Sequence, residues 1–348
     1  MLRGRLLKSV FVGALLAGTG VVAPTRPTPA AGVDGGPAGD ESLAERWAPI
    51  HHQSVDPHGP HSAGGRADEI TRVDFDGNWN ARDNWEHAER YPAAAYAYAS
   101  VVQTSTHWFL VYMFFHARDW TNRPFFDSEH ENDAEGLLLA VEKDGTPYGR
   151  LRAAITVAHG DFYSYVPLGS PWSTGGETVD GTLPMQVSPG DGRAHPVTAQ
   201  EAHGHALRAY AGGTGGVVYY PAAEAGVPRG PGDRDVGYRI IDLFGPDGLW
   251  SRRADPDLFA APGTFASDAP RGVRDGCGQG TFRCKLDAAH APWAWDDEDD
   301  GPARGEFATD PASVVAAYFT IPEPLSRAYV SNGYRPSSRA LPAGGGPE

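Results

Sequence analysis

The sequence predicts a mostly β protein, specifically a β-sandwich with peripheral helices. Glycine (44 residues) and proline (30 residues) are frequent among the 348 residues, which disfavours a helical bundle and favours short strands joined by turns. Hydrophobic residues make up 41% of the chain, enough to build a core. The apolar runs are short and are separated by turn signals such as Gly175-Gly176 and Pro246-Asp247-Gly248, a spacing typical of a sandwich.

The N-terminus has the layout of a secretory signal peptide. Arg3, Arg5 and Lys8 precede an apolar stretch from residue 10 to 22, and small residues and prolines follow through Ala31. We expect residues 1–31 to be a signal peptide, cleaved between about residues 23 and 32, and the mature protein to be secreted; a retained membrane anchor is the alternative. No second apolar run of about 20 residues follows, so we expect no transmembrane segment in the mature chain.

The remaining chain is expected to form one domain. Residues 32–41 are rich in Gly, Pro and Asp and are interpreted as a linker, residues 42–335 as a single β-sandwich domain with an extended C-terminal region from about 245, and residues 336–348 as a disordered tail. The net charge of −15 argues against nucleic acid as a partner, because phosphate binding needs a surplus of Lys and Arg. Cys277 and Cys284 are expected to form a local disulfide in an exported protein.

Helices are expected only at the two ends of this domain. One runs from Ser42 to about Trp47, and a second begins at Pro311, where proline suits the first helical position. The histidine-rich stretch 51–65 is interpreted as a loop. Period-2 alternation or β-branched and aromatic residues predict strands near Tyr96 and over residues 106–117, 137–141, 151–157, 162–166, 205–210, 217–220 and 236–243.

The densest polar cluster runs from Asp119 to Glu135, between two of these apolar strands. Asp133 and Glu135 would share one face of a strand, because side chains alternate with period 2, and His130 could fold over them from the preceding turn. Such groups repel one another unless a cation neutralises them. Carboxylates with one imidazole favour Mg²⁺, Mn²⁺ or Ca²⁺ over a structural zinc site. A solvated charged loop is the alternative interpretation.

The same residues resemble a known family, the necrosis- and ethylene-inducing-peptide-like proteins. These are secreted, plant-directed toxins and elicitors that act in virulence, and their heptapeptide G-H-R-H-D-W-E stands just before a core strand. The corresponding stretch here is Glu129-His130-Glu131-Asn132-Asp133-Ala134-Glu135. A later His-Gly pair and a further family histidine correspond to His159-Gly160 and to the segment His203-Gly204-His205, so the resemblance covers roughly residues 41–245.

The resemblance implies a β-sandwich with a divalent cation at one end. The family's metal-binding positions match Asp119, His130, Asp133 and Glu135, and His159 is implied to contact the ligand. In the family the cation supports binding of sphingolipid head groups on plant membranes, so a membrane-surface glycan or lipid head group is the implied partner. The family's Arg-His pair and Trp are replaced at positions 131, 132 and 134, so the resemblance implies the metal site without implying cytolytic activity.

Other functions remain open from the sequence. An extracellular metal-dependent hydrolase could use the same acidic pocket, with the metal polarising a substrate oxygen; no G-x-S-x-G elbow or H-E-x-x-H pattern is present. A structural domain whose cation only ties loops together is a third hypothesis.

Two further acidic segments are candidate calcium sites. Asp74-Phe75-Asp76-Gly77-Asn78 has the start of a calcium loop, but position twelve would be Trp85, so we interpret it as a polar turn. The acidic run at 296–301 is interpreted as a solvated loop, with calcium binding as the alternative. Trp293 and Trp295, which flank it, could instead contact sugars.

Overall fold

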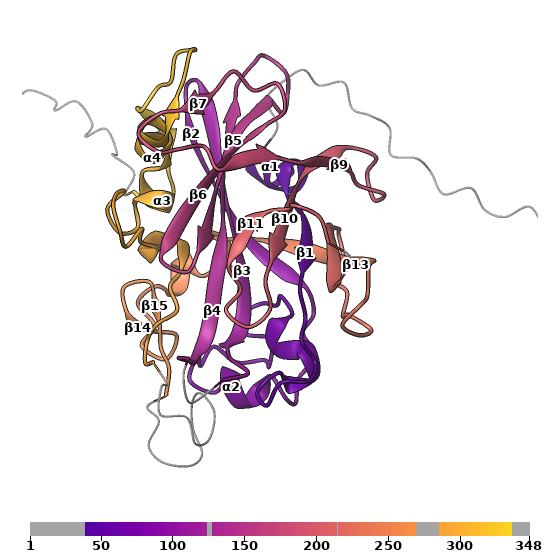
Figure 1. Ribbon diagram of the computed structural model, residues 1–348. Coiled ribbons are helices and arrows are strands. Elements are labelled where there is room, and N and C mark those ends of the chain that lie inside the picture. Colours follow the sequence, from indigo (N-terminus) through magenta and orange to yellow (C-terminus); the bar gives the residue numbers. More distant parts are fainter. Residues whose placement is uncertain (1–38, 124–126, 214, 269–284, 336–348) are drawn as a thin grey trace, which may run out of the picture. The chain divides into compact units, whose positions relative to one another are not determined.

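The computed structural model describes residues 39–123, 127–213, 215–268 and 285–335, which all belong to one compact unit (Figure 1). The predicted signal peptide, residues 32–38 of the predicted linker, Cys277, Cys284 and the predicted tail lie outside the described residues. No helix within the described ranges is long and apolar enough to cross a membrane.

The prediction of a mostly β protein is confirmed. Helices are short: α1 (Asp40–Trp47), α2 (Asn84–His87), α3 (Glu306–Thr309) and α4 (Pro311–Tyr318), with 3₁₀ turns at Ala63–Asp68, Trp250–Arg252 and Pro292–Ala294. The strands are β1 (Ile50–Gln53), β2 (Tyr96–Thr104), β3 (His107–Asp119), β4 (His130–Glu142), β5 (Arg150–Ala158), β6 (Asp161–Pro167), β7 (Ser173–Thr174), β8 (Gly181–Leu183), β9 (Met185–Val187), β10 (Ala194–Gln200), β11 (Leu207–Ala209), β12 (Val217–Pro221), β13 (Val236–Asp242), β14 (Phe259–Ala261), β15 (Thr264–Phe265), β16 (Phe319–Thr320) and β17 (Tyr329–Ser331).

Most strands join one mixed sheet, so the finer prediction of a two-sheet sandwich is not specifically confirmed. The sheet has 13 strands, with the order β11-β10-β1-β12-β13-β2-β3-β4-β5-β6-β8; β17 pairs with β2 and β9 pairs with β10. Its two ends approach each other, because β11 packs against β5 and β8. The sheet is therefore nearly closed on itself.

The histidine-rich stretch is not wholly a loop, as the sequence had suggested. Its first residues form β1, which lies between β10 and β12. His51 is fully buried there, stacks on Phe114 with ring centroids 4.1 Å apart, and contacts Thr198 Oγ1 at 3.1 Å. An imidazole that finds both an aromatic face and a polar partner can be buried at little cost, so the histidines did not prevent a strand.

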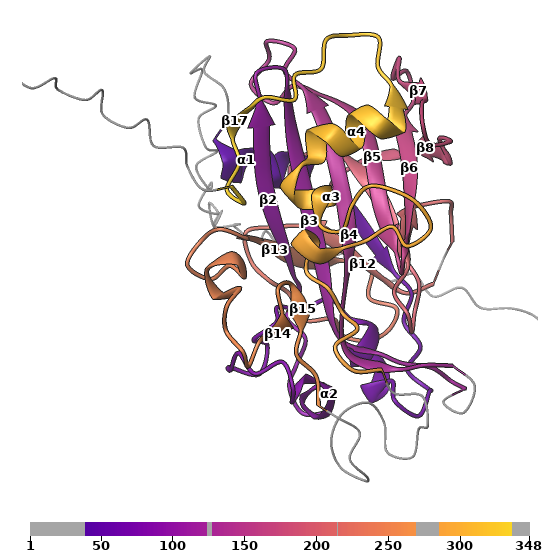
Figure 2. The same cartoon turned by 90° about the vertical axis from the view of Figure 1, so that its left-hand side faces the viewer.

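The central strands β3 and β4 are buried on both faces. One face, which carries Leu110, Tyr112 and Phe114, packs toward α1, β12 and β13. The opposite face, which carries Phe109 and Phe115 among others, packs against the region after residue 245. Figure 2 shows α3 and α4 lying over this part of the sheet. Burial on both faces explains why β3 reads as a continuous aromatic run rather than an alternating one.

The region after residue 245 is thus a layer of the core. Phe307 is fully buried and makes edge contacts with the rings of Phe162 and Trp295, with centroids 4.8 and 5.3 Å away. Trp295 Nε1 donates to the carbonyl oxygen of Ala134 at 2.9 Å, which ties this layer to β4. A Cβ at position 136 would meet Tyr112 O at 1.8 Å and the Trp295 ring at 2.6 Å, so Gly136 permits the close packing here.

We predict that Phe307→Ala lowers the free energy of unfolding by about 3–5 kcal/mol, the usual cost of removing a buried aromatic ring. Chemical denaturation measures it. Val330→Ala is the control, because Val330 is 68% exposed and its truncation should change stability by less than about 0.5 kcal/mol. Equal, small effects of both substitutions would show that the C-terminal layer is not part of the cooperative core.

Candidate metal site

A pocket of about 880 Å³ opens where β3 ends and β4 begins. All five residues singled out from the sequence line it, together with residues that follow β5 and β10 and with part of the C-terminal layer. The side chains with polar or charged atoms include Asp119, His130, Asp133, Glu135, His159, Glu201, His203, Lys285, His290, Glu298 and Arg304. The predicted residues are therefore brought to one cavity, and the chemistry depends on how they pair within it.

Asp119 and His130 form the first pair. The antiparallel register places them directly opposite each other at the ends of β3 and β4. His130 Nε2 lies 3.1 Å from Asp119 Oδ2, and His130 Nδ1 lies 2.8 Å from the carbonyl oxygen of Asn132. Burial lowers the pKa of His130, but the adjacent Asp119 carboxylate outweighs it and raises this pKa to about 9.

A backbone irregularity brings His130 to the same pocket as Asp133 and Glu135. In a regular strand His130 would face away from the other two, because alternate residues point to opposite faces. Asn132 has a φ of 61°, in the left-handed region, which interrupts the alternation. Its buried side chain stabilises this conformation, since Nδ2 donates to the carbonyl oxygens of Ala81 and Ala266 at 2.9 and 3.0 Å.

Asp133 and Glu135 lie deep in the pocket and are held by hydrogen bonds. The backbone N–H of Ala134 donates to Asp133 Oδ1 at 2.8 Å. Glu135 accepts from the backbone N–H groups of His159, at 2.6 Å, and Leu207, at 3.0 Å, one on each carboxylate oxygen. Glu135 thus connects three strands, because β5 precedes His159 and β11 begins at Leu207.

The two carboxyl groups have oppositely shifted pKa values. Burial and the charge of Asp133 raise the pKa of Glu135 well above its usual value. Burial alone would also raise the pKa of Asp133, but its hydrogen bond to His205 lowers it overall. Two like charges in one buried site cannot both be accommodated without compensation. In this structure a proton on Glu135 and the ring of His205 beside Asp133 provide that compensation, and a bound cation would take their place.

His205 and Asp68 belong to the site but were not among the predicted ligands. His205 Nδ1 lies 2.9 Å from Asp133 Oδ2, and its Nε2 lies 3.3 Å from Asp68 Oδ1; Asp68 and the His205 ring are fully buried. The ring also stacks on His116, 3.7 Å away and nearly parallel. His205 belongs to the segment His203-Gly204-His205, which in the sequence corresponds to a family histidine. Asp68 lies in a 3₁₀ turn far away along the chain, and no sequence motif marks it.

His159, the predicted ligand-contact residue, lies at the rim. Its side chain is 54% exposed, and its Nε2 lies 3.4 Å from Glu201 Oε1. The bond with Glu201 raises the pKa of His159. His159 follows the last residue of β5 with a φ of 60°, so the turn itself directs the ring toward the pocket mouth.

The four predicted ligands do not form a compact set of donor atoms. Within the described residues, two groups of three potential ligands have atoms within 4.8 Å of one another: Asp76, Asp83 and His87, and Asp161, Asp297 and Asp299. In the pocket, Asp133 is drawn toward His205 and Glu135 toward backbone amides instead. The donor types fit a hard divalent cation, and the imidazole groups supply the compensating positive charge in this structure.

Comparisons with known proteins give only weak similarities. No family model and no curated protein matches the sequence. Necrosis and Ethylene inducing Protein 2, from the causal agent of cocoa's witches' broom disease, is 16% identical over 64% of this chain and 83% of that chain, with a TM-score of 0.35. NLPPya in complex with glucosamine is 12% identical over 62% and 78%, with a TM-score of 0.28.

A third solved structure, titled as a toxin fold for microbial attack and plant defense, is 13% identical over 58% of this chain and 78% of that chain, with a TM-score of 0.26. These TM-scores are all below 0.5. Similarity at this level carries no information on the function of this chain.

Proposed function

We propose that this protein is exported, binds a divalent metal ion through Asp119, His130, Asp133 and Glu135, and uses the loaded site to bind a glycan or sphingolipid head group at a membrane surface. The observation that carries the proposal is the convergence of these four side chains, from the facing ends of β3 and β4, on one open cavity. The order of motifs shared with necrosis-inducing proteins supports the ligand class.

The donor chemistry supports Mg²⁺, Ca²⁺ or Mn²⁺. Three carboxylates and one imidazole make an oxygen-rich set, and the opposed pKa shifts of Asp133 and Glu135 reflect the negative charge that such an ion would offset. His130 suits a ligand role, because its Nδ1–H is donated to the Asn132 carbonyl, so that loss of the proton from Nε2 would present the Nε2 lone pair to the cation. When bound, the ion would supply a Lewis-acidic centre for hydroxyl or phosphate oxygens of the ligand.

The residues around the mouth support recognition of a polar head group. Lys285 and Arg304 offer positive charge to a phosphate, and Glu201 offers acceptors to sugar hydroxyls. His159, exposed at the rim, is placed to contact a ligand that enters the cavity. Export is proposed from the basic and apolar composition of residues 1–31 alone.

We predict that Asp133→Asn lowers the number of Mn²⁺ ions bound per chain by one, or weakens the affinity for one Mn²⁺ about 100-fold or more. The reason is that even residues that only orient metal ligands change the metal affinity about 10–100-fold when they are replaced. Calorimetric titration of the purified protein measures both quantities. Asp247→Asn is the control, because it removes an exposed carboxylate that lines a different pocket. Identical stoichiometry and affinity in all three proteins would remove the proposed site.

We also predict metal-dependent binding to vesicles that contain a glycosylated sphingolipid. Sedimentation of protein with such vesicles should require Mn²⁺ or Ca²⁺, should be lost with a chelator, and should weaken in His159→Ala. Vesicles of phosphatidylcholine alone are the control. Equal sedimentation with and without chelator would contradict the role of the ion, and turnover of a glycan or phosphodiester substrate would favour a hydrolase instead.

The affinity for the metal should rise with pH. Since the pKa of His130 is about 9 in the metal-free protein, its imidazole is protonated at neutral pH, and the ion must displace that proton to bind. The dissociation constant of Mn²⁺ should therefore fall at least about tenfold per pH unit between pH 6 and 8, and level off above pH 9. An affinity that is constant over this range would show that His130 is not a ligand.

A further inference from the structure

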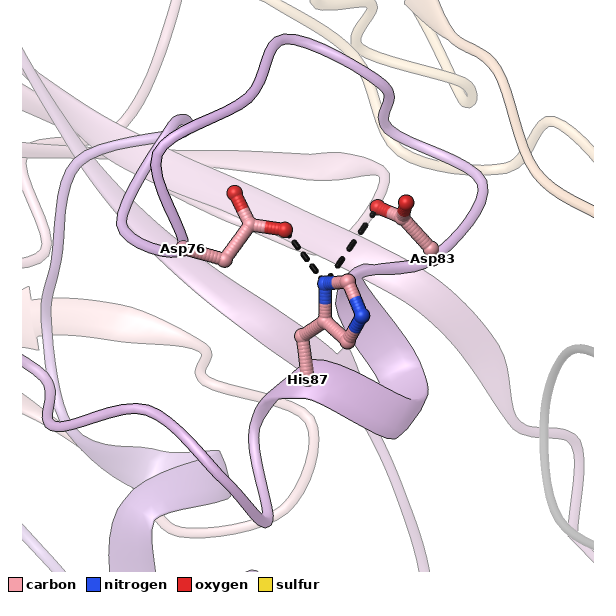
Figure 3. A group of neighbouring side chains, drawn as sticks. All are labelled: Asp76, Asp83 and His87. Atoms are coloured by element: carbon pink, nitrogen blue, oxygen red, sulfur yellow. Dashed lines mark hydrogen bonds and ion pairs between the residues drawn. The ribbon is translucent and has the colours of Figure 1, made fainter.

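A second group of potential ligands lies in the loop before β2, outside the pocket described above. It consists of Asp76, Asp83 and His87, whose donor atoms all lie within 4.8 Å of one another (Figure 3). Asp83 and His87 are four residues apart at the start and end of α2, which places them on one side of the turn. Asp76 faces them from the segment that the sequence suggested was only a polar turn.

The Asp76 carboxylate forms the base of this group. Its side chain is fully buried, and its Oδ2 is hydrogen-bonded to His87 Nδ1. Asn78 holds it in place, because its backbone N–H donates to Oδ1 at 3.0 Å and its Nδ2 donates to Oδ2 at 2.6 Å. These hydrogen bonds fix the orientation of the Asp76 carboxylate, so the group is preorganised to bind a cation.

Asp83 adds a carboxylate oxygen that accepts no hydrogen bond. Its Oδ2 accepts a hydrogen bond from Asn80 Nδ2 at 3.0 Å. Its Oδ1 atom is buried, has no hydrogen-bond partner, and faces His87 Nδ1 at 3.7 Å. The Asp83 side chain is 31% exposed, so an ion can reach this oxygen from solvent without breaking a hydrogen bond to it. Figure 3 shows that the carboxylates of Asp76 and Asp83 both face the ring of His87.

We propose that Asp76, Asp83 and His87 bind a second divalent ion, of the Zn²⁺ or Mn²⁺ type. Two carboxylates and an imidazole are a common donor set for such ions, which accept nitrogen readily. Calcium fits less well, because it prefers six to eight oxygen ligands and because the glutamate that closes a calcium loop is replaced by Trp85. This site does not rest on the function proposed for the larger pocket.

The position of the site gives it a structural role. The loop that carries it contacts the start of β4: Asn84 Nδ2 donates to Asn132 Oδ1 at 2.7 Å, and the backbone N–H of Trp85 donates to Glu131 Oε1 at 2.9 Å. Glu131 and Asn132 stand next to the ligands of the larger pocket and replace the family's Arg-His pair. The second ion therefore braces the loop that supports the left-handed bend of β4.

The test measures Zn²⁺ binding by equilibrium dialysis in an Asp133→Asn background, which disables the larger site. This protein should bind one Zn²⁺ per chain. Adding Asp83→Asn and His87→Gln should abolish that ion or weaken its binding about 100-fold or more. Adding the matched Asp247→Asn instead should leave binding unchanged. Unchanged Zn²⁺ binding after loss of Asp83 and His87, or no binding in Asp133→Asn alone, would overturn the proposal.

A spectroscopic measurement with a milder single substitution separates loss of a ligand from misfolding. Co²⁺ added to the Asp133→Asn protein should give visible absorption bands of a site with nitrogen and oxygen ligands, and the milder single substitution His87→Gln should shift or remove them. The bands should disappear when one equivalent of Zn²⁺ is added. Bands that are unaffected by His87→Gln would place the ion elsewhere and contradict the proposal. Failure of the larger site would appear separately, as equal Mn²⁺ stoichiometry in wild type and Asp133→Asn.

Discussion

The pairing of β3 with β4 is the constraint on which the rest of the structure depends. Both strands are 13 residues long, and their register sets Asp119 opposite His130. Apolar side chains fill both faces of the pair along most of its length, and a group of carboxylates and histidines lies at the end where β3 stops and β4 starts. The carboxylates at this end are buried and only partly hydrated, so their negative charge needs a positive group nearby.

Histidines provide that compensation in the present arrangement. His130 lies beside Asp119, and His205 lies between Asp133 and Asp68. Either a divalent ion or a protonated histidine can neutralise the buried carboxylates. Because histidines do so in this structure, the four proposed ligands share a cavity without forming a compact donor cluster. Binding of an ion then requires a proton to leave and the Asp133 and Glu135 carboxylates to turn toward it.

Much of the fold and part of the site could be predicted from the sequence. The aromatic run of β3 and the proline at the start of α4 each act locally, so both elements were predicted with nearly correct bounds. The apolar run at residues 137–141 predicted only the later part of β4, which begins at His130, within the polar cluster. α1 begins at Asp40, two residues earlier than expected. The nearly closed mixed sheet could not be predicted, because it depends on pairings such as β1 with β10 that join distant parts of the chain.

The same limit applies to the site. The proposed ligand positions near His130 could be selected from the sequence because they lie close together along the chain, whereas Asp68 reaches the pocket residues only through the tertiary fold. The left-handed conformation of Asn132 could not be predicted from the sequence either, because it is stabilised by hydrogen bonds to Ala81 and Ala266 in two distant loops. The group of Asp76, Asp83 and His87 was missed because only the folded α2 turn places His87 over the acidic residues.

The most direct measurement of the central claim is an anomalous diffraction map from crystals grown with Mn²⁺. We expect a strong peak in the β3–β4 pocket, with atoms of Asp119, His130, Asp133 and Glu135 at about 2.0–2.6 Å from its centre, the range seen for hard divalent ions. A map without a peak there, with Asp133 still bonded to His205 and Glu135 to the backbone amides, would contradict it.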